Sequence, residues 1–89
     1  MELLKLISFI KRGKNRKIVF LALDKPMIPS ELVMEIYKSN SNTYFNLVSR
    51  ALSELKKKKL VEVVNPKEKT GRIYRRTKEG EKIMKKLLV

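Results

Sequence analysis

Apolar residues recur every three or four positions in five segments of this chain, the spacing that places them on one face of an α-helix. Leu60–Val64 is instead rich in β-branched residues and suits a strand, and Arg72–Arg76 returns after a polar loop as a second strand. The pattern therefore predicts helices over Glu2–Ile10, Asn15–Leu23, Ser30–Lys38, 41–58 and 78–89, with the two strands between the last two helices.

The connections between these segments carry their own signals. Gly13 separates the first two helices, and two prolines make Asp24–Pro29 an extended linker in which Met27-Ile28 could pair as a very short strand. The polar cluster Ser39–Asn42 joins the third and fourth helices, and either Ser41 or Asn42 can cap the fourth. Two helices joined by so short a turn cross steeply, as in a helix-turn-helix unit.

The helix predicted over 41–58 has two contrasting sides. At 100° per residue its apolar side contains Tyr44, Val48, Ala51, Leu52 and Leu55. Its other side contains Asn42, Thr43, Asn46, Ser49, Arg50, Ser53 and Lys57. Short amides and hydroxyls fit close to base edges, arginine can bind guanine with two hydrogen bonds, and lysines reach phosphates. This side predicts a DNA-reading face, and an ordinary solvated surface is the alternative.

Some of these residues also have simpler roles open to them. Arg50 could form an ion pair with Glu54 four residues later, and the run Lys56–Lys59 could be a solubilising surface rather than a set of phosphate contacts. Arg72, Arg75 and Arg76 alternate along a strand, so about half of them must point away from any ligand. The aromatic side chains are expected in the core rather than against bases: Tyr44, Phe45 and Tyr74.

Composition adds a large positive charge. The formal net charge is +13, with nine basic and five acidic residues up to Leu55 and thirteen basic and four acidic residues after it. A field of this size favours polyanions: DNA, RNA or an anionic membrane. The basic residues do not lie opposite a long apolar face on one helix, which disfavours the membrane surface.

The side chains on which most enzymes and metal sites depend are missing. The sequence has no histidine and no cysteine, and it contains no paired carboxylates at useful spacing and no glycine-rich phosphate loop. We therefore expect no enzymatic activity, no cofactor and no metal. No apolar run approaches the length of a membrane span, and no basic region precedes the N-terminal apolar stretch, so a cytoplasmic location is expected.

Three helices, a hairpin and a final helix follow one another in the order of the winged helix-turn-helix domain. The sequence resembles small archaeal transcriptional regulators of that superfamily, similar to the ArsR and MarR groups, over roughly residues 15–82. The matching pieces are Pro29-Ser30-Glu31-Leu32, Val48–Leu52 with Leu55, Leu60-Val61-Glu62, Asn65-Pro66, and Gly71–Tyr74 leading to Thr77 and Gly80. The resemblance implies one domain over residues 1–89 with an α+β, mainly helical fold.

The resemblance also implies a sequence-specific transcriptional regulator that binds double-stranded DNA. Helix 41–58 would read the major groove, and the wing 65–72 would contact the minor groove or the backbone. The alternative is a winged-helix module of the general transcription machinery, or an RNA-binding module. The candidate DNA-binding residues are Ser41, Asn42, Thr43, Asn46, Ser49, Arg50, Ser53, Lys57, Lys67, Lys69, Arg72 and Arg75.

The sequence departs from the family pattern at the base of the wing. Lys59 stands where the family commonly has glycine, so Lys59 must adopt a left-handed conformation or the turn must differ. The metal-sensing cysteines of ArsR-type sensors are absent, and no small-molecule effector is identifiable.

The flanking helices 1–12 and 78–89 both carry apolar stripes. The residues of these stripes are Leu3, Leu6, Ile7, Phe9, Ile10, Ile83, Met84, Leu87 and Leu88. Such regulators usually read two half-sites as dimers, so we expect a homodimer built from one or both helices. The alternative is that the two helices pack on each other within one chain.

Overall fold

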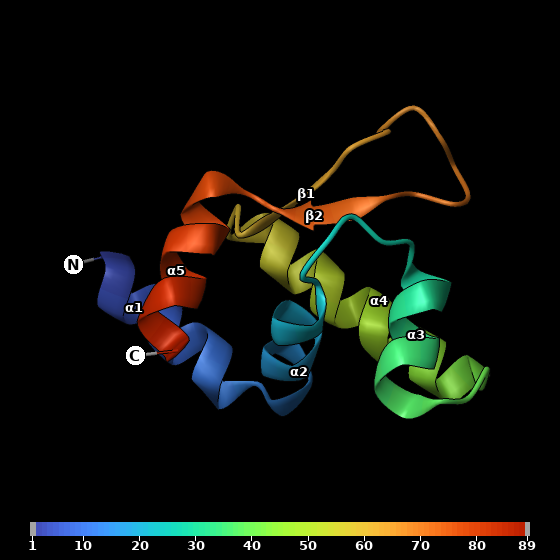
Figure 1. Ribbon diagram of the computed structural model, residues 1–89, viewed down its shortest axis with the longest axis horizontal. Helices are drawn as coiled ribbons and strands as arrows, with labels where there is room; N and C mark the ends of the chain where they lie inside the picture. Colours follow the sequence, from blue (N-terminus) through green and yellow to red (C-terminus); the bar gives the residue numbers. More distant parts are fainter. Residues whose placement is uncertain (1, 89) are drawn as a thin grey trace.

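The computed structural model describes residues 2–88, with side chains described from Leu3 to Leu87 (Figure 1). The elements follow in the order α1 (Glu2–Arg12), α2 (Lys14–Ala22), α3 (Pro29–Tyr37), α4 (Asn42–Lys57), β1 (Val61–Val63), β2 (Tyr74–Arg76) and α5 (Lys78–Leu88). Within this range the fold is α+β and mainly helical, which confirms the expected class. Between residues 2 and 88, none of the helices has both the length and the apolar character that crossing a bilayer requires.

The core lies between α2, α3 and α4, which pack on one another. These helices contribute the buried side chains Val19, Phe20, Leu32, Val33, Val48, Ala51, Leu52 and Leu55. On α4 these residues, with the half-buried Tyr44, are the apolar side predicted from the periodicity. The ring of Tyr44 stacks on that of Tyr37 with 4.1 Å between centroids, which joins the start of α4 to the end of α3.

The two strands pair antiparallel, with Val61 opposite Arg76 and Val63 opposite Tyr74. Met27 of the linker adds an isolated bridge to Tyr74, and each backbone N–H donates to the other residue's carbonyl, at 3.0 and 2.8 Å. The very short strand expected at Met27-Ile28 therefore forms at Met27. The strands are shorter than predicted, partly because the Ile73 N–H donates to the side chain of Asn65 rather than to a neighbouring strand.

The helix boundaries differ from the predicted ones by one or two residues. α1 continues past Ile10 to Arg12, which leaves Gly13 as the break that the sequence indicated. α3 begins at Pro29 rather than Ser30, since proline suits the first helical position, where no backbone donor is needed. The carboxylate of Glu31 accepts a hydrogen bond from the Ile28 N–H at 2.9 Å and so satisfies a donor at the start of α3.

At the end of α4, Lys59 has a φ of 61°, which is the left-handed conformation and the first of the two alternatives expected for it. The Lys59 N–H donates to the carbonyl of Lys56, and the Leu60 N–H donates to the carbonyl of Leu55. This pair of bonds is a Schellman motif, and the buried side chains of Leu55 and Leu60 supply the hydrophobic contact that accompanies it. The left-handed residue turns the chain directly from α4 into β1.

Thr77 connects the start of α5 to this turn. Its hydroxyl donates to the carbonyl of Lys59 at 2.7 Å and accepts from the Gly80 N–H at 3.0 Å, so Thr77 is the N-cap of α5. A Cβ atom on Gly80 would collide with the carbonyl oxygen of Leu60. The close approach of α5 to the end of α4 therefore requires glycine at this position.

Most residues in the apolar stripes of α1 and α5 pack against other residues of the same chain. α1 lies against α2 and α5 (Figure 1), with Ile10 and Ile83 fully buried. The half-buried members that pack on this core are Leu6, Ile7, Phe9, Met84 and Leu87. Leu3 and Leu4 stay exposed, at 36% and 71%. The side chain of Leu88, counted in the predicted stripe, lies outside the described residues.

Candidate nucleic-acid interface

The outer side of α4 is a continuous exposed polar surface. Ser41 begins the helix by accepting a hydrogen bond from the Tyr44 N–H at 3.2 Å, which confirms it as the cap and leaves its hydroxyl hydrogen free to donate. The predicted DNA-binding residues that are exposed on this helix are Asn42, Thr43, Asn46, Arg50, Ser53 and Lys57. Ser49, at the edge of the buried stripe, is half-buried.

Arg50 does not form the ion pair with Glu54 that its spacing allowed. The carboxylate of Glu54 instead lies 3.7 Å from the guanidinium of Arg16 on α2, which also stacks on the ring of Phe9 at 4.0 Å. Among the residues whose side chains are described, Arg50 has no carboxylate partner. Its charge is therefore available to a ligand at the middle of the polar side of α4.

The four lysines at the end of α4 do not all share the same surroundings. Lys56 and Lys57 are exposed in the last turn of the helix. The ammonium of Lys58 lies 5.5 Å from the centroid of the Phe9 ring, on the side of α1, and Lys59 occupies the left-handed turn. The run is therefore not one phosphate-binding cluster, since Lys58 lies on the side of α1 whereas Lys56 and Lys59 line a cleft beside β1 and the start of α5.

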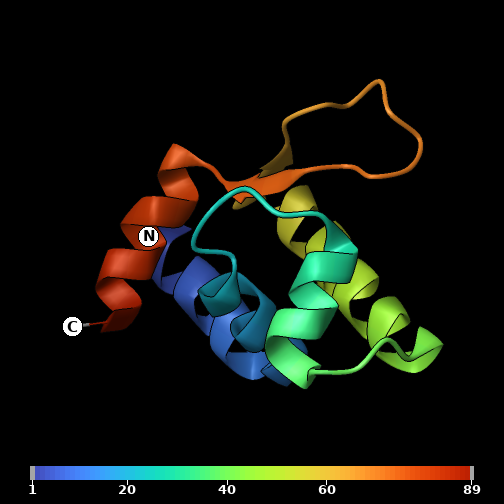
Figure 2. The same cartoon turned by 45° about the vertical axis from the view of Figure 1, so that its right-hand side comes forward.

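The loop between the strands is held in shape by its own polar groups. The side chain of Asn65 bridges the loop, donating to the carbonyl of Gly71 at 3.2 Å and accepting from the Ile73 N–H at 2.7 Å. The Arg72 Nε donates to the carbonyl of Glu68 at 2.8 Å, and Gly71 has a φ of 64°. Because three bonds close it internally, the loop projects from the helices with a defined shape (Figure 2).

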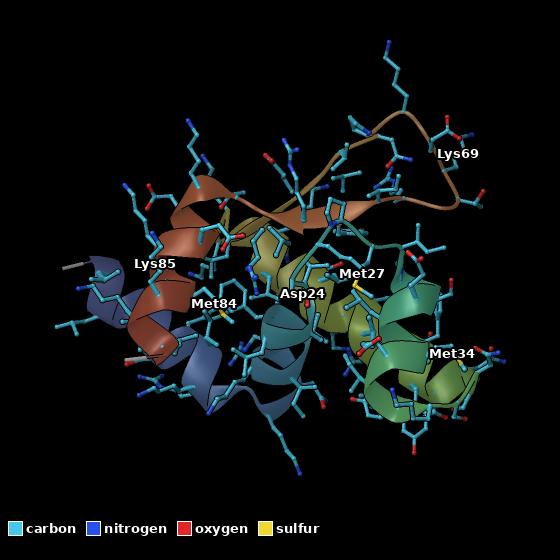
Figure 3. All side chains as sticks on the ribbon, viewed as in Figure 1. Asp24, Met27, Met34, Lys69, Met84 and Lys85 are labelled. Atoms are coloured by element: carbon cyan, nitrogen blue, oxygen red, sulfur yellow. The ribbon has the colours of Figure 1, made fainter. Side chains whose placement is uncertain are left out.

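This hairpin loop presents positive charge at its outer end. Lys67 and Lys69 are both exposed, and Figure 3 shows Lys69 at the far end of the loop, away from the helices. Arg72 is half-buried, but its bond to Glu68 uses only one of the five N–H groups of a guanidinium. All three predicted wing cations can therefore reach a phosphate.

The last two arginines have partners within the chain. Arg75 lies directly opposite Glu62 in the sheet, and its Nε is 2.7 Å from the carboxylate, so its charge is compensated. Arg76, whose side chain is only 6% exposed, donates to the carbonyl of Phe20 at 2.8 Å and pairs with Glu81. Among the candidate cations whose side chains are described, Arg75 is the one paired with a carboxylate, and Arg76 joins β2 to α2 and α5.

The loop and α4 border a common cleft of about 340 Å³. Its walls come from the hairpin loop, the start of α3 and one residue of α4, namely Lys69–Arg72 with Tyr74, Ile28–Ser30, and Phe45. A second, smaller hollow joins Phe45 to Ser41 and Asn42 at the start of α4. The structure therefore brings the N-terminal half of α4 close to the loop cations, whereas Ser53 and Lys57 lie further along the helix.

Phe45 was expected in the core, and that expectation is wrong. Its side chain is 43% exposed, although neighbouring Tyr44 is half-buried and stacked on Tyr37. The helical geometry gave a signal of this exposure, since Phe45 falls beside the predicted apolar side of the helix rather than within it. The sequence alone did not indicate that the hairpin loop would stand across a cleft from this ring.

Comparisons of this chain with protein-family models, with curated proteins and with solved structures found no match.

Proposed function

We propose that this protein is a sequence-specific DNA-binding transcriptional regulator with a winged helix-turn-helix fold. In this proposal α3 and α4 form the helix-turn-helix unit, α4 enters the major groove, and the hairpin loop is the wing. The observation that carries the proposal is the exposed polar side of α4, with Arg50 at its centre and without a carboxylate partner among the described side chains.

The dimensions of α4 support this role. Its 16 residues span about 24 Å, and a single helix fits the roughly 12 Å width of the major groove. The side chains on its outer side are short apart from Arg50 and Lys57, so the backbone of the helix can approach the base edges closely. Arg50 can then bind guanine with two hydrogen bonds, while Asn42 and Asn46 can bind adenine.

The hairpin loop supports the same proposal through its order and charge. Its internal hydrogen bonds fix the loop before any ligand binds, which lowers the entropy lost on binding. Lys67, Lys69 and Arg72 then supply contacts to the phosphate backbone or the minor groove beside the segment that α4 reads. Access to DNA would place the protein in the cytoplasm.

We further propose that the protein binds as a homodimer, because one recognition helix covers only a few base pairs. α1 supplies the support for this, since Leu3 and Leu4 remain exposed after the rest of its stripe has packed within the chain. Association through this end of the molecule would leave α4 and the hairpin loop free to bind two half-sites.

The decisive experiment is selection of bound duplexes from a random pool, followed by sequencing and titration of the selected site. A regulator will enrich one sequence and bind it at least about a thousandfold more tightly than random duplex. Enrichment of no sequence, or equal binding of single-stranded RNA, would refute the proposal and would favour a module of the transcription machinery or an RNA-binding module.

A further inference from the structure

Phe45 is an exposed aromatic ring at the edge of the polar side of α4. Its 43% exposure leaves a large apolar surface in water, at the point where α4 meets the hairpin loop. Asn42 and Ser49 lie three residues before it and four after it, so they flank the ring on the same side of the helix. These are two of the side chains proposed to read base edges.

The surroundings of the ring are charged as well as apolar. The cleft beside it is lined by Lys69 and Arg72 of the hairpin loop and by Ile28 and Pro29 at the start of α3. Cations on one wall and an aromatic ring on the other fit a ligand with phosphates next to an apolar group. Duplex DNA in the major groove offers one apolar group at the base edges, which is the C5-methyl group of thymine.

We propose that Phe45 is a specificity-determining residue that recognises the methyl group of a thymine in the bound DNA. This inference rests on the proposed function, because it needs α4 in the major groove. Phe45 has no polar atom and contributes through burial against the methyl, while Lys69 and Arg72 hold the adjacent backbone. The polar residues of α4 read donors and acceptors, and Phe45 adds discrimination between thymine and cytosine at one position.

The test replaces thymine by uracil, one position at a time, in the duplex selected from the random pool. This change removes only the methyl group and keeps every hydrogen-bonding atom of the base pair. We expect one position at which the wild-type protein binds the uracil duplex about fourfold more weakly, the effect of burying one methyl-sized group. In Phe45→Ala the thymine and uracil duplexes should bind equally at that position, because the partner of the methyl is gone.

Two further variants test whether the loss of the thymine preference is due to the Phe45 side chain itself. Phe45→Leu keeps an apolar side chain and should retain part of the thymine preference, even if Phe45→Ala is poorly folded. Met34→Ala is the matched control, since Met34 is 44% exposed but lies on α3, outside the cleft beside Phe45 (Figure 3). Met34→Ala should keep the wild-type ratio of the affinities for the thymine and uracil duplexes. Circular dichroism should show wild-type helix content in each variant compared.

The outcomes separate this inference from the proposed function. Equal wild-type binding to thymine and uracil duplexes at every position, or an unchanged ratio in Phe45→Ala, would overturn the role of Phe45 while sequence-specific binding stood. A selected site without thymine would do the same. Failure to bind any duplex would overturn both.

Discussion

The salt dependence of DNA binding follows from the number of cations that the interface leaves free. Of the basic residues predicted to contact DNA, Arg75 is compensated by Glu62 and is not counted. Arg50 is assigned to base edges and is not counted either, so four cations remain for phosphates: Lys57, Lys67, Lys69 and Arg72. Four neutralised phosphates give a slope of log K against log salt of about −3.6, so affinity should fall about 150-fold between 50 and 200 mM salt.

The measurement is a fluorescence-anisotropy titration of a labelled duplex at four or more salt concentrations. Lys69→Ala should make the slope less steep by about 0.9, since it removes one phosphate contact. Lys85→Ala is the matched control, because it changes the net charge of the protein by the same amount. Lys85 lies on α5, at the opposite end of the molecule from the hairpin loop (Figure 3).

This comparison distinguishes a defined interface from general attraction between a basic protein and a polyanion. If Lys69→Ala and Lys85→Ala change the slope equally, the charge acts without a fixed binding geometry and the assignment of the hairpin loop is wrong. A slope near zero for the wild-type protein would refute phosphate binding altogether.

Three other predictions follow from the same structure. Arg50→Ala should weaken binding to the preferred site by about 1–3 kcal/mol and relax specificity, whereas Arg72→Ala should weaken binding to all duplexes similarly. Equal losses on specific and random DNA for Arg50→Ala would contradict the assignment of Arg50 to base edges. Lys59→Gly should raise the free energy of unfolding by about 0.5–1 kcal/mol in urea denaturation, because glycine adopts the left-handed φ of 61° with less strain. An unchanged urea midpoint would show that the turn is unstrained. Sedimentation equilibrium at micromolar concentration should give a dimer mass that Leu4→Glu reduces to the monomer mass, and a monomer mass for the wild-type protein would refute the dimer.

The sequence predicted those features that depend on neighbouring positions. The buried stripe of α4 and its cap at Ser41 both depend on residues within one or two helical turns. Lys59 differs, because the two alternatives expected for it came from the resemblance to a family with glycine at this position, and the structure has the left-handed one. The stripe and the cap need only local geometry.

The features that the sequence did not predict join segments far apart in the chain. Spacing on α4 allowed Arg50 to pair with Glu54, yet Glu54 lies nearer to Arg16, a partner that only the packing of α2 on α4 supplies. Arg75 and Glu62 face each other only once the strand register is set. The exposure of Phe45 likewise depends on where the hairpin loop stands. Helical periodicity contains no information on such pairings.

The bridge between Met27 and Tyr74 constrains the order in which this chain folds. The two residues lie on opposite sides of α3 and α4 in the sequence, so their hydrogen bonds close a loop that contains both helices. Closing a long loop has an entropic cost that grows with its length, whereas helices and their short turns form from local contacts. We therefore expect the helical part to assemble first and the hairpin to dock afterwards onto the linker before α3.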